Sequence, residues 1–247
     1  MKAEPSAQLT LLDLQAIDSE VAKLRHQLAH PAEAAELAEL AKRRAETDGW
    51  VRDQQIVVDD LAAAQAKADA DVEQVKARRK RDQDRIDAGQ IANPKDLERM
   101  QHELATLERR ITVLEDEEIE VMEELETAQT GLAALRADLA EIDEKVGVLV
   151  AARDERAAGL REQLAEVEAK RAPVVAGVPE DLLALYEKIR ETRGGVGAAL
   201  LRARQCGGCM MALDPRTISA IRGKDEDEVV RCEECSRILV RTAESGL

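Results

Sequence analysis

The chain has 247 residues, of which 35% are charged and 1% are aromatic, with no phenylalanine. Ordinary globular domains carry about 25% charged residues, so this composition argues against a large globular core and is typical of long helices and coiled coils. The net charge is −15, which argues against a protein that coats duplex nucleic acid, because such proteins present a basic surface to the phosphates.

The amino-terminal apolar run breaks at Asp13, and no stretch approaches the ~20 apolar residues of a membrane span. We therefore expect a cytoplasmic protein with no membrane partner. Thiols are reduced by default in the cytoplasm, where paired cysteines favour a metal site over disulfides.

The first helical segment is indicated by apolar residues at coiled-coil spacing, which stop before Pro31. Proline cannot continue a helix interior, so the helix is expected to end there. The apolar positions are Leu14, Ile17, Val21, Leu24 and Leu28.

A second segment, 32–86, keeps a weaker apolar register that Arg44 and Arg79 interrupt. Trp50 follows Gly49 within it and is expected to pack locally at a kink, although an exposed tryptophan is also a candidate anchor for a partner.

Residues 87–94 carry the clearest turn signal of the chain. Gly89 can end one helix, Asn93 can cap the next, and Pro94 suits a first helical position. We therefore predict that residues 1–171 form an antiparallel coiled-coil hairpin with its tip near 87–94. An intermolecular coiled coil is the alternative.

The strongest periodicity lies between residues 97 and 149, where two interleaved sets of residues recur every seven positions. Fifteen of these sixteen positions are apolar, and Glu118 is the exception. This is the 3.5-residue repeat of a left-handed coiled coil. The sets are Leu97, Leu104, Ile111, Glu118, Leu125, Leu132, Leu139 and Val146, and Met100, Leu107, Leu114, Val121, Ala128, Leu135, Ile142 and Leu149.

A basic stretch close to the predicted tip opposes the acidic net charge. Its cations could contact nucleic acid or an acidic protein surface. Interhelical ion pairs with Glu98, Glu103 and Glu108 are the alternative. Without aromatic side chains for stacking, RNA or DNA binding would depend on phosphates and would be weak and salt-sensitive. The candidate contact residues are Lys76, Arg78, Arg79, Lys80, Arg81 and Arg85.

Residues 172–202 are predicted to form a linker that contains a short amphipathic helix, 180–193, ended by Gly194 and Gly195. Its apolar face is expected to pack on the base of the coiled coil or on the terminal module, and packing is the expected role of Tyr186. That face carries Leu182, Leu183, Tyr186 and Ile189.

The four cysteines, Cys206, Cys209, Cys232 and Cys235, form two C-x2-C pairs separated by 22 residues. Two such knuckles supply the four sulfurs that tetrahedral Zn(II) takes, so residues 203–247 are predicted to be a C4-type zinc ribbon with one structural ion. Strands are expected in "EVVR", "RILVR" and "MMALD". Gly207 and Gly208 are expected to ease the turn of the first knuckle.

Two other interpretations of the cysteines remain open. One is a pair of structural disulfides. The other is a redox switch, since Arg204, Arg231 and Arg237 could favour thiolates. No constellation of catalytic residues is recognisable, so we expect neither an enzyme nor a small-molecule substrate.

The chain resembles a bacterial family of coiled-coil hairpin proteins with a C-terminal four-cysteine zinc ribbon. The turn "NPKDLERMQHEL", the linker "PEDLLALYEKIRETRGG", and "CGGCMMAL" with "VVRCEECSRILVR" carry the resemblance. It implies no enzymatic activity. Members of the family are linked to the alternative sigma factor of nitrogen and flagellar genes, and some to messenger RNA.

The leading hypothesis is accordingly an adaptor in gene expression that binds a protein of the transcription apparatus, nucleic acid, or both. The resemblance implies a sigma factor or RNA polymerase as the protein partner. A purely structural coiled-coil tether and a zinc-thiol redox sensor are the alternatives. Relatives often carry other residue types at Met210, Glu233 and Glu234, and the two acids argue against nucleic-acid contact by the ribbon.

Overall fold

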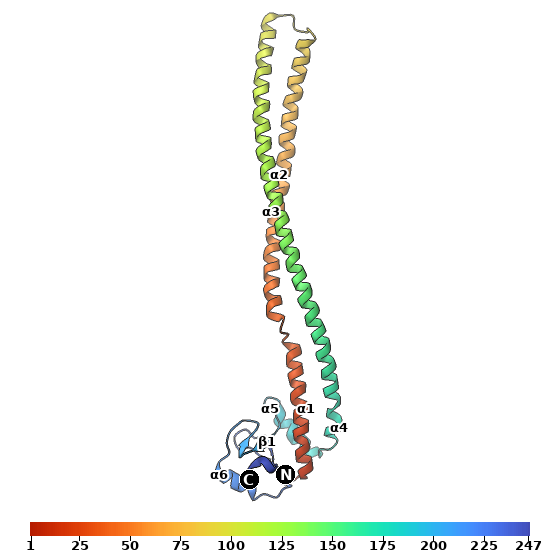
Figure 1. Ribbon diagram of the computed structural model, residues 1–247, viewed down its shortest axis with the longest axis vertical. Helices are drawn as coiled ribbons and strands as arrows, with labels where there is room; N and C mark the ends of the chain where they lie inside the picture. The colour runs from red at the N-terminus through yellow and green to blue at the C-terminus, as the bar shows by residue number, and fades with distance from the viewer. The chain divides into compact units, whose positions relative to one another are not determined.

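A computed structural model of the protein describes all 247 residues. The fold is mainly α-helical with a small carboxy-terminal sheet (Figure 1), as predicted. None of the helices combines the length and apolarity that a membrane span requires. The elements are α1 Pro5–Ala29, α2 Ala34–Asp87, α3 Pro94–Ala169, α4 Arg171–Val175, α5 Glu180–Thr192, β1 Ala198–Arg202, β2 Gln205–Cys206, α6 Pro215–Arg222, β3 Val230–Arg231, β4 Ile238–Val240 and the 3-10 turn η1 Ala243–Ser245.

The chain divides into two compact units. One unit comprises Ala35–Leu149, which is the helical hairpin; the other combines Met1–Ala34 with Val150–Leu247.

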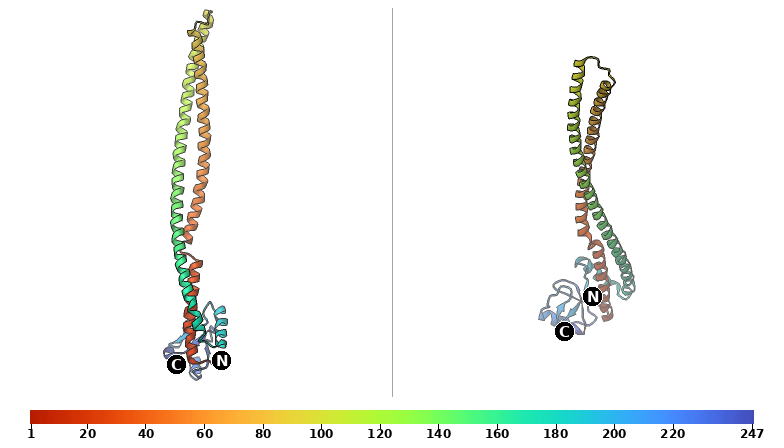
Figure 2. Two further views of the ribbon diagram at one scale, coloured as in Figure 1. Left: turned by 90° about the vertical axis from the view of Figure 1, so that its right-hand side faces the viewer. Right: turned by 45° about the horizontal axis from the view of Figure 1, so that its top comes forward.

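In the hairpin unit, α2 and α3 run antiparallel, and the three views agree that they lie side by side (Figures 1 and 2). The predicted seam of α3 is confirmed, because none of its sixteen positions is exposed. Apolar residues of α2 close the seam from the other side, for example Val58, which packs with Leu125, Ala128 and Leu132. The hairpin is therefore held by a narrow apolar stripe between charged faces.

The turn at the tip forms as predicted. Gly89 has a φ of +70°, in the left-handed region where a residue without Cβ is not strained. Asn93 caps α3, since its Oδ1 accepts a hydrogen bond from the backbone N–H of Lys95 at 3.0 Å. Pro94 is the first residue of the helix.

Two expectations for α2 are corrected. Arg44 does not disturb the pairing, because its Nε donates to Asp143 Oδ1 of α3 at 2.6 Å. Trp50 was expected to be packed at a kink, but α2 continues unbroken through Gly49, and Trp50 is 56% exposed. It occupies the same outward face as Val57, seven residues later, which is also exposed.

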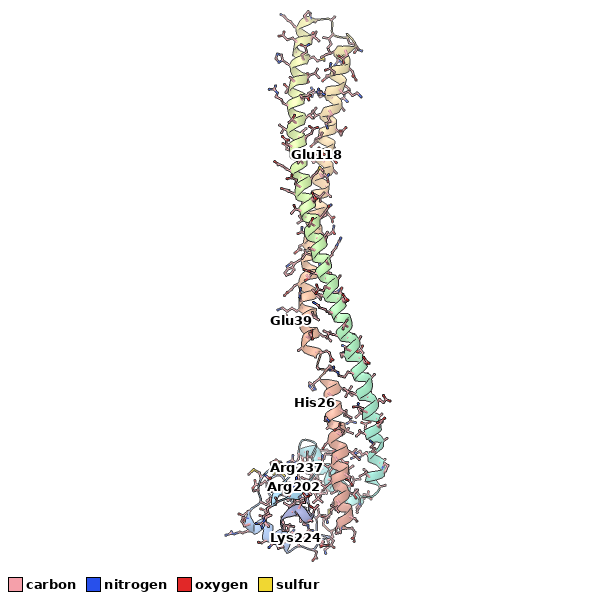
Figure 3. All side chains as sticks on the ribbon, viewed as in Figure 1. His26, Glu39, Glu118, Arg202, Lys224 and Arg237 are labelled. Atoms are coloured by element: carbon pink, nitrogen blue, oxygen red, sulfur yellow. The ribbon has the colours of Figure 1, made fainter.

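Glu118, the one polar residue of the α3 seam, lies half-buried within the hairpin (Figure 3). Its contact with Asp69 of α2 raises its pKa above the usual range, and burial and the charge of Asp69 act in the same direction. The ionised carboxylate is thus unfavourable at this position.

Replacing Glu118 by leucine is expected to raise the thermal midpoint of the hairpin, measured by far-UV circular dichroism. Because the folded-state pKa of Glu118 is raised, the wild-type chain gains stability as the pH falls through that pKa, so the advantage of leucine should be larger at pH 7 than at pH 4. The exposed Glu120→Leu is the control. An equal effect of both substitutions at both pH values would contradict this account of the seam.

The second unit contains a four-stranded sheet of order β2-β1-β4-β3. The predicted strands around the second knuckle are confirmed as β3 and β4, which pair antiparallel. The third predicted strand, "MMALD", is wrong, because only Ala212 forms an isolated bridge there. Met210 has a φ of +62°, outside the range of a strand. Asp214, the last residue of the predicted strand, instead caps helix α6, and the sequence analysis did not predict this helix.

Two further features depart from the expected layout of this unit. Strand β1 lies in the range predicted as a linker, yet it pairs parallel with β4 through Ala198 and Ile238. The amino-terminal residues also contact the ribbon, where the Ala3 N–H donates to the Asp227 carbonyl at 2.7 Å. The domain limits 1–171, 172–202 and 203–247 stay predictions.

Helix α5 docks as predicted. Tyr186 and Leu182 are fully buried, and Leu183 is partly buried against the same cluster. That cluster joins α1 to β1 and β4 through apolar side chains, so α5 is packed on both of the surfaces that the sequence offered as alternatives. Its members include Leu11, Leu14, Leu182, Tyr186, Ile189, Ala198, Ile238 and Val240.

Candidate metal centre

The structure brings all four predicted cysteines together at one end of the sheet. Their four Sγ atoms lie within 4.8 Å of one another. Cys206 and Cys235 are separated by 3.8 Å between sulfurs, and Cys209 and Cys232 by 3.9 Å. Four sulfurs placed tetrahedrally at ~2.3 Å from Zn(II) would lie about 3.8 Å apart, so the donor set fits this ion.

The two knuckles use the same local turn. The residue after the second cysteine is left-handed in both, with a φ of +62° at Met210 and +64° at Ser236. In both, its N–H donates to the carbonyl of the first cysteine, at 2.8 Å for Met210 and 2.9 Å for Ser236. This turn directs both thiols of a knuckle to one point.

The two glycines of the first knuckle have a different role from the predicted one. Neither has a positive φ. A Cβ at Gly207 would lie 2.9 Å from the Leu200 carbonyl oxygen, and a Cβ at Gly208 would lie 2.6 Å from Arg237 Cδ. Close approach of the knuckle to β1 and Arg237, rather than backbone freedom, is what requires glycine here.

The cysteines differ in their affinity for protons. Burial raises the pKa of Cys206 to about 12 and also raises that of Cys232. At Cys235 burial acts in the same direction, but hydrogen bonds from the backbone and side chain of Arg237 and from neighbouring thiols lower the pKa to about 7. A bound divalent cation would stabilise all four thiolates together.

The three arginines near the cysteines mostly donate hydrogen bonds to backbone carbonyls. Arg204 Nε donates to the Gly246 carbonyl at 2.9 Å, and Arg231 Nε donates to the Ser236 carbonyl at 3.0 Å. Arg237 Nε donates to the Val196 carbonyl at 3.0 Å and is the only one of the three that lowers a cysteine pKa. Arg237 therefore favours a thiolate at Cys235, as the redox-switch hypothesis requires, whereas Arg204 and Arg231 do not.

The predicted basic stretch divides into two groups. Lys76, Arg78 and Arg79 form ion pairs across the hairpin with Glu115, Glu103 and Glu108, and Lys76 Nζ lies 2.7 Å from Glu115 Oε1. Glu98 forms no ion pair. The remaining cations are exposed and unpaired, and only these three are free to meet a partner: Lys80, Arg81 and Arg85.

A buried polar cluster was missed by the sequence reasoning. Asp18 of α1 is 3% exposed and accepts hydrogen bonds from Tyr186 Oη and Arg171 Nε, both at 2.8 Å. Arg190 Nη1 lies 3.3 Å from the same carboxylate, and Glu187 pairs with both arginines. Burial, followed by the contact with Asp18, raises the pKa of Tyr186 above its usual value. The one sequence signal for this cluster was the position of Asp18, an acid between the apolar seam positions Ile17 and Val21.

Residues 14–194 match the CT398-like coiled coil hairpin domain. The chain belongs to this family. Residues 205–239 match a C4-type zinc ribbon domain, so both parts of the predicted resemblance are confirmed. The clustered cysteines of this C4-type ribbon support zinc binding.

Relatives of this chain are found in mycobacteria. An uncharacterized protein of Mycobacterium tuberculosis (strain H37Rv) is 34% identical over 253 residues, which is 98% of each chain. A solved structure from Mycobacterium smegmatis is 34% identical with a TM-score of 0.85, covering 98% of this chain and 100% of that one.

Two more distant solved structures share the fold. CT398 from Chlamydia trachomatis has a TM-score of 0.65 at 18% identity, covering 95% of this chain and 97% of that chain. The HP0958 protein of Helicobacter pylori has a TM-score of 0.51 at 15% identity, covering 97% and 98%. At this identity the likeness shows the fold alone.

Proposed function

We propose that this protein is a non-enzymatic adaptor in gene expression, whose zinc ribbon and helical hairpin bind a protein of the transcription apparatus. The observation that carries the proposal is the closed cluster of four thiols on a small sheet that packs on α1 and α5. The family resemblance names a sigma factor or RNA polymerase as the class of partner.

The proposed metal is a single structural zinc ion held by Cys206, Cys209, Cys232 and Cys235. Four thiolates fill all four tetrahedral positions, so no position remains for a water molecule or a substrate. Bound zinc would crosslink the two knuckles. The cysteines join Leu201, Ile218 and Leu239 in the apolar core of the ribbon, which contains no aromatic residue.

The surroundings of the ribbon favour a rigid presentation of its surface. Gln15 of α1 accepts from the Gly197 N–H at 2.7 Å and donates to the Gly195 carbonyl at 3.0 Å. Together with the Asp18 cluster, these contacts fix the start of β1 against α1. A surface held this way loses little conformational freedom when a partner binds.

Crosslinking mass spectrometry in the native host tests this function. We expect the ribbon of the full-length chain to crosslink to a sigma factor or an RNA polymerase subunit, and these crosslinks to disappear in Cys206→Ser. A partner that binds Cys206→Ser as well as wild type would favour the structural tether instead, and recovery of no transcription protein would contradict the adaptor.

Nucleic-acid binding at the hairpin tip is expected to be micromolar at best. Since three cations are unpaired, the logarithm of the binding constant should fall with the logarithm of salt concentration with a slope of roughly −2 for single strands. Replacing Arg78, Arg79, Lys80 and Arg81 by alanine should abolish binding, measured by fluorescence anisotropy with labelled RNA.

The paired and unpaired cations provide the control for this prediction. Lys80→Ala with Arg81→Ala should weaken binding more than Arg78→Ala with Arg79→Ala, because the latter two are held by Glu103 and Glu108. Binding that is insensitive to these changes or to salt would rule out the tip as a phosphate-binding site.

A further inference from the structure

The negative charge of the chain is concentrated in the middle of the hairpin. We define the acidic belt as residues 59–72 of α2 and 115–128 of α3, which lie opposite each other, as the contact of Asp69 with Glu118 shows. The belt contains twelve acidic residues and one lysine, a net charge of −11, out of −15 for the whole chain. Glu118 marks this region in Figure 3.

Most of this charge is not neutralised within the protein. Only Glu115 and Glu117 have a basic partner within 4.0 Å, namely Lys76 and Arg110. The other ten carboxylates have none. Like charges at this density repel each other, and they flank a part of the seam to which α2 contributes Leu61, Ala68 and Val72 but also the polar Gln65. Stability that is given up in this way is typical of surfaces kept for function.

A shallow groove lined by both apolar and polar side chains runs through the belt on one flank of the hairpin, with Gln65 and Gln129 among the polar ones. Leu125 is buried at its base, and Ile119 and Met122 line it with 53% and 46% of their surfaces exposed. Glu123 and Glu126 also line it, and its volume is about 360 Å³. Ile119 and Met122 are three residues apart and therefore share one face of α3. Two exposed apolar side chains rimmed by carboxylates form a surface of mixed character.

The chemistry of the groove selects its occupant. Phosphates would be repelled by a net charge of −11, so nucleic acid is disfavoured. A second copy of this chain offers only Lys80, Arg81 and Arg85 as free cations of its basic stretch. Its net charge of −15 repels the belt as a whole, so a second copy is disfavoured as well. The backbone of both helices is already hydrogen-bonded, so the contact must be made by side chains, as when a third helix packs along two others.

We propose that this groove docks a basic amphipathic helix of a protein partner, with apolar side chains on Ile119 and Met122 and flanking Lys or Arg on the belt carboxylates. This proposal deepens the adaptor function and rests on it for the class of partner. Met122 suits such a contact, because its flexible thioether side chain adapts to different apolar surfaces.

The test uses the full-length chain and a fluorescein-labelled 18-residue peptide of leucine and lysine with a helical apolar repeat. Fluorescence anisotropy should show saturable binding, and Glu123→Lys with Glu126→Lys should weaken it at least tenfold. Met122→Ser should also weaken it. Hydrogen exchange should show protection by the peptide in 115–129.

The matched control reverses two exposed, unpaired acids elsewhere on α3, Asp138→Lys with Glu144→Lys, which changes the net charge by the same amount. If this control loses as much affinity as the groove variant, the attraction is general and the proposal fails. No saturable peptide binding, or a single-stranded RNA that binds the groove instead, also overturns it. Cys206→Ser should bind the peptide normally, so failure of the ribbon function is distinguishable from failure of the groove.

Discussion

Replacing Cys206 by serine is expected to unfold the ribbon sheet and α6 while α2 and α3 stay helical. A structural zinc site contributes on the order of 10 kcal/mol to folding, and a module of this size without aromatic residues buries too little surface to replace it. Cys206 is fully buried at the centre of the ribbon core. Amide hydrogen exchange in β3 and β4 should accelerate by roughly a thousandfold or more.

Cys209→His is the matched control for this substitution. Cys209 is the one partly exposed member of the cluster, and zinc accepts three cysteines and one histidine. This variant should keep the metal and the slow exchange. The zinc account is wrong if Cys206→Ser retains slow exchange in β3 and β4, or if both variants behave alike.

Replacing Asp18 by alanine is expected to destabilise the unit that joins α1, α5 and the sheet by about 3 kcal/mol. The substitution leaves Arg171, Arg190 and the hydroxyl of Tyr186 without their shared acceptor. Both arginines are about one-third exposed, so water can solvate them in part. The loss of stability should therefore lie at the lower end of the range known for breaking a buried ion pair. Equilibrium unfolding in urea, followed by hydrogen exchange of α5 and β1, measures the change.

Two variants separate the charge cluster from general effects of substitution. The exposed Asp13→Ala on the same helix should change stability by less than about 0.5 kcal/mol. Tyr186→Phe removes one of the donors and should cost about 1 kcal/mol. A loss at Asp18→Ala no larger than that at Asp13→Ala would show that the buried cluster contributes nothing.

The parts of the fold that were predictable have local signals. The sixteen seam positions of α3 repeat every 3.5 residues regardless of what they pack against, and the turn is encoded by Gly89, Asn93 and Pro94 within a few residues. Cys206 to Cys235 likewise carry their chemistry in their spacing. Helix α6 has the same local signal as α3, an acceptor side chain followed by proline at Asp214 and Pro215, and could have been found.

The parts that were missed depend on partners distant in sequence. Strand β1 is defined by its pairing with β4, about 40 residues later. Its sequence shows no alternation of apolar and polar residues that would distinguish a strand from a short helix. Asp18 meets Arg171 across 153 positions, and nothing in either segment identifies the other. Trp50 was placed wrongly because Gly49 weakens a helix without breaking it when the rest of the helix is paired.

The metal content of the purified full-length chain tests the central claim most directly, which is that two cysteine knuckles organise the ribbon around one ion. Elemental analysis combined with native mass spectrometry should find one zinc per chain, and chelation should alter the amide spectrum of the ribbon while that of the hairpin is unchanged. A chain that contains no zinc, or a ribbon spectrum unaffected by chelation, would contradict the account.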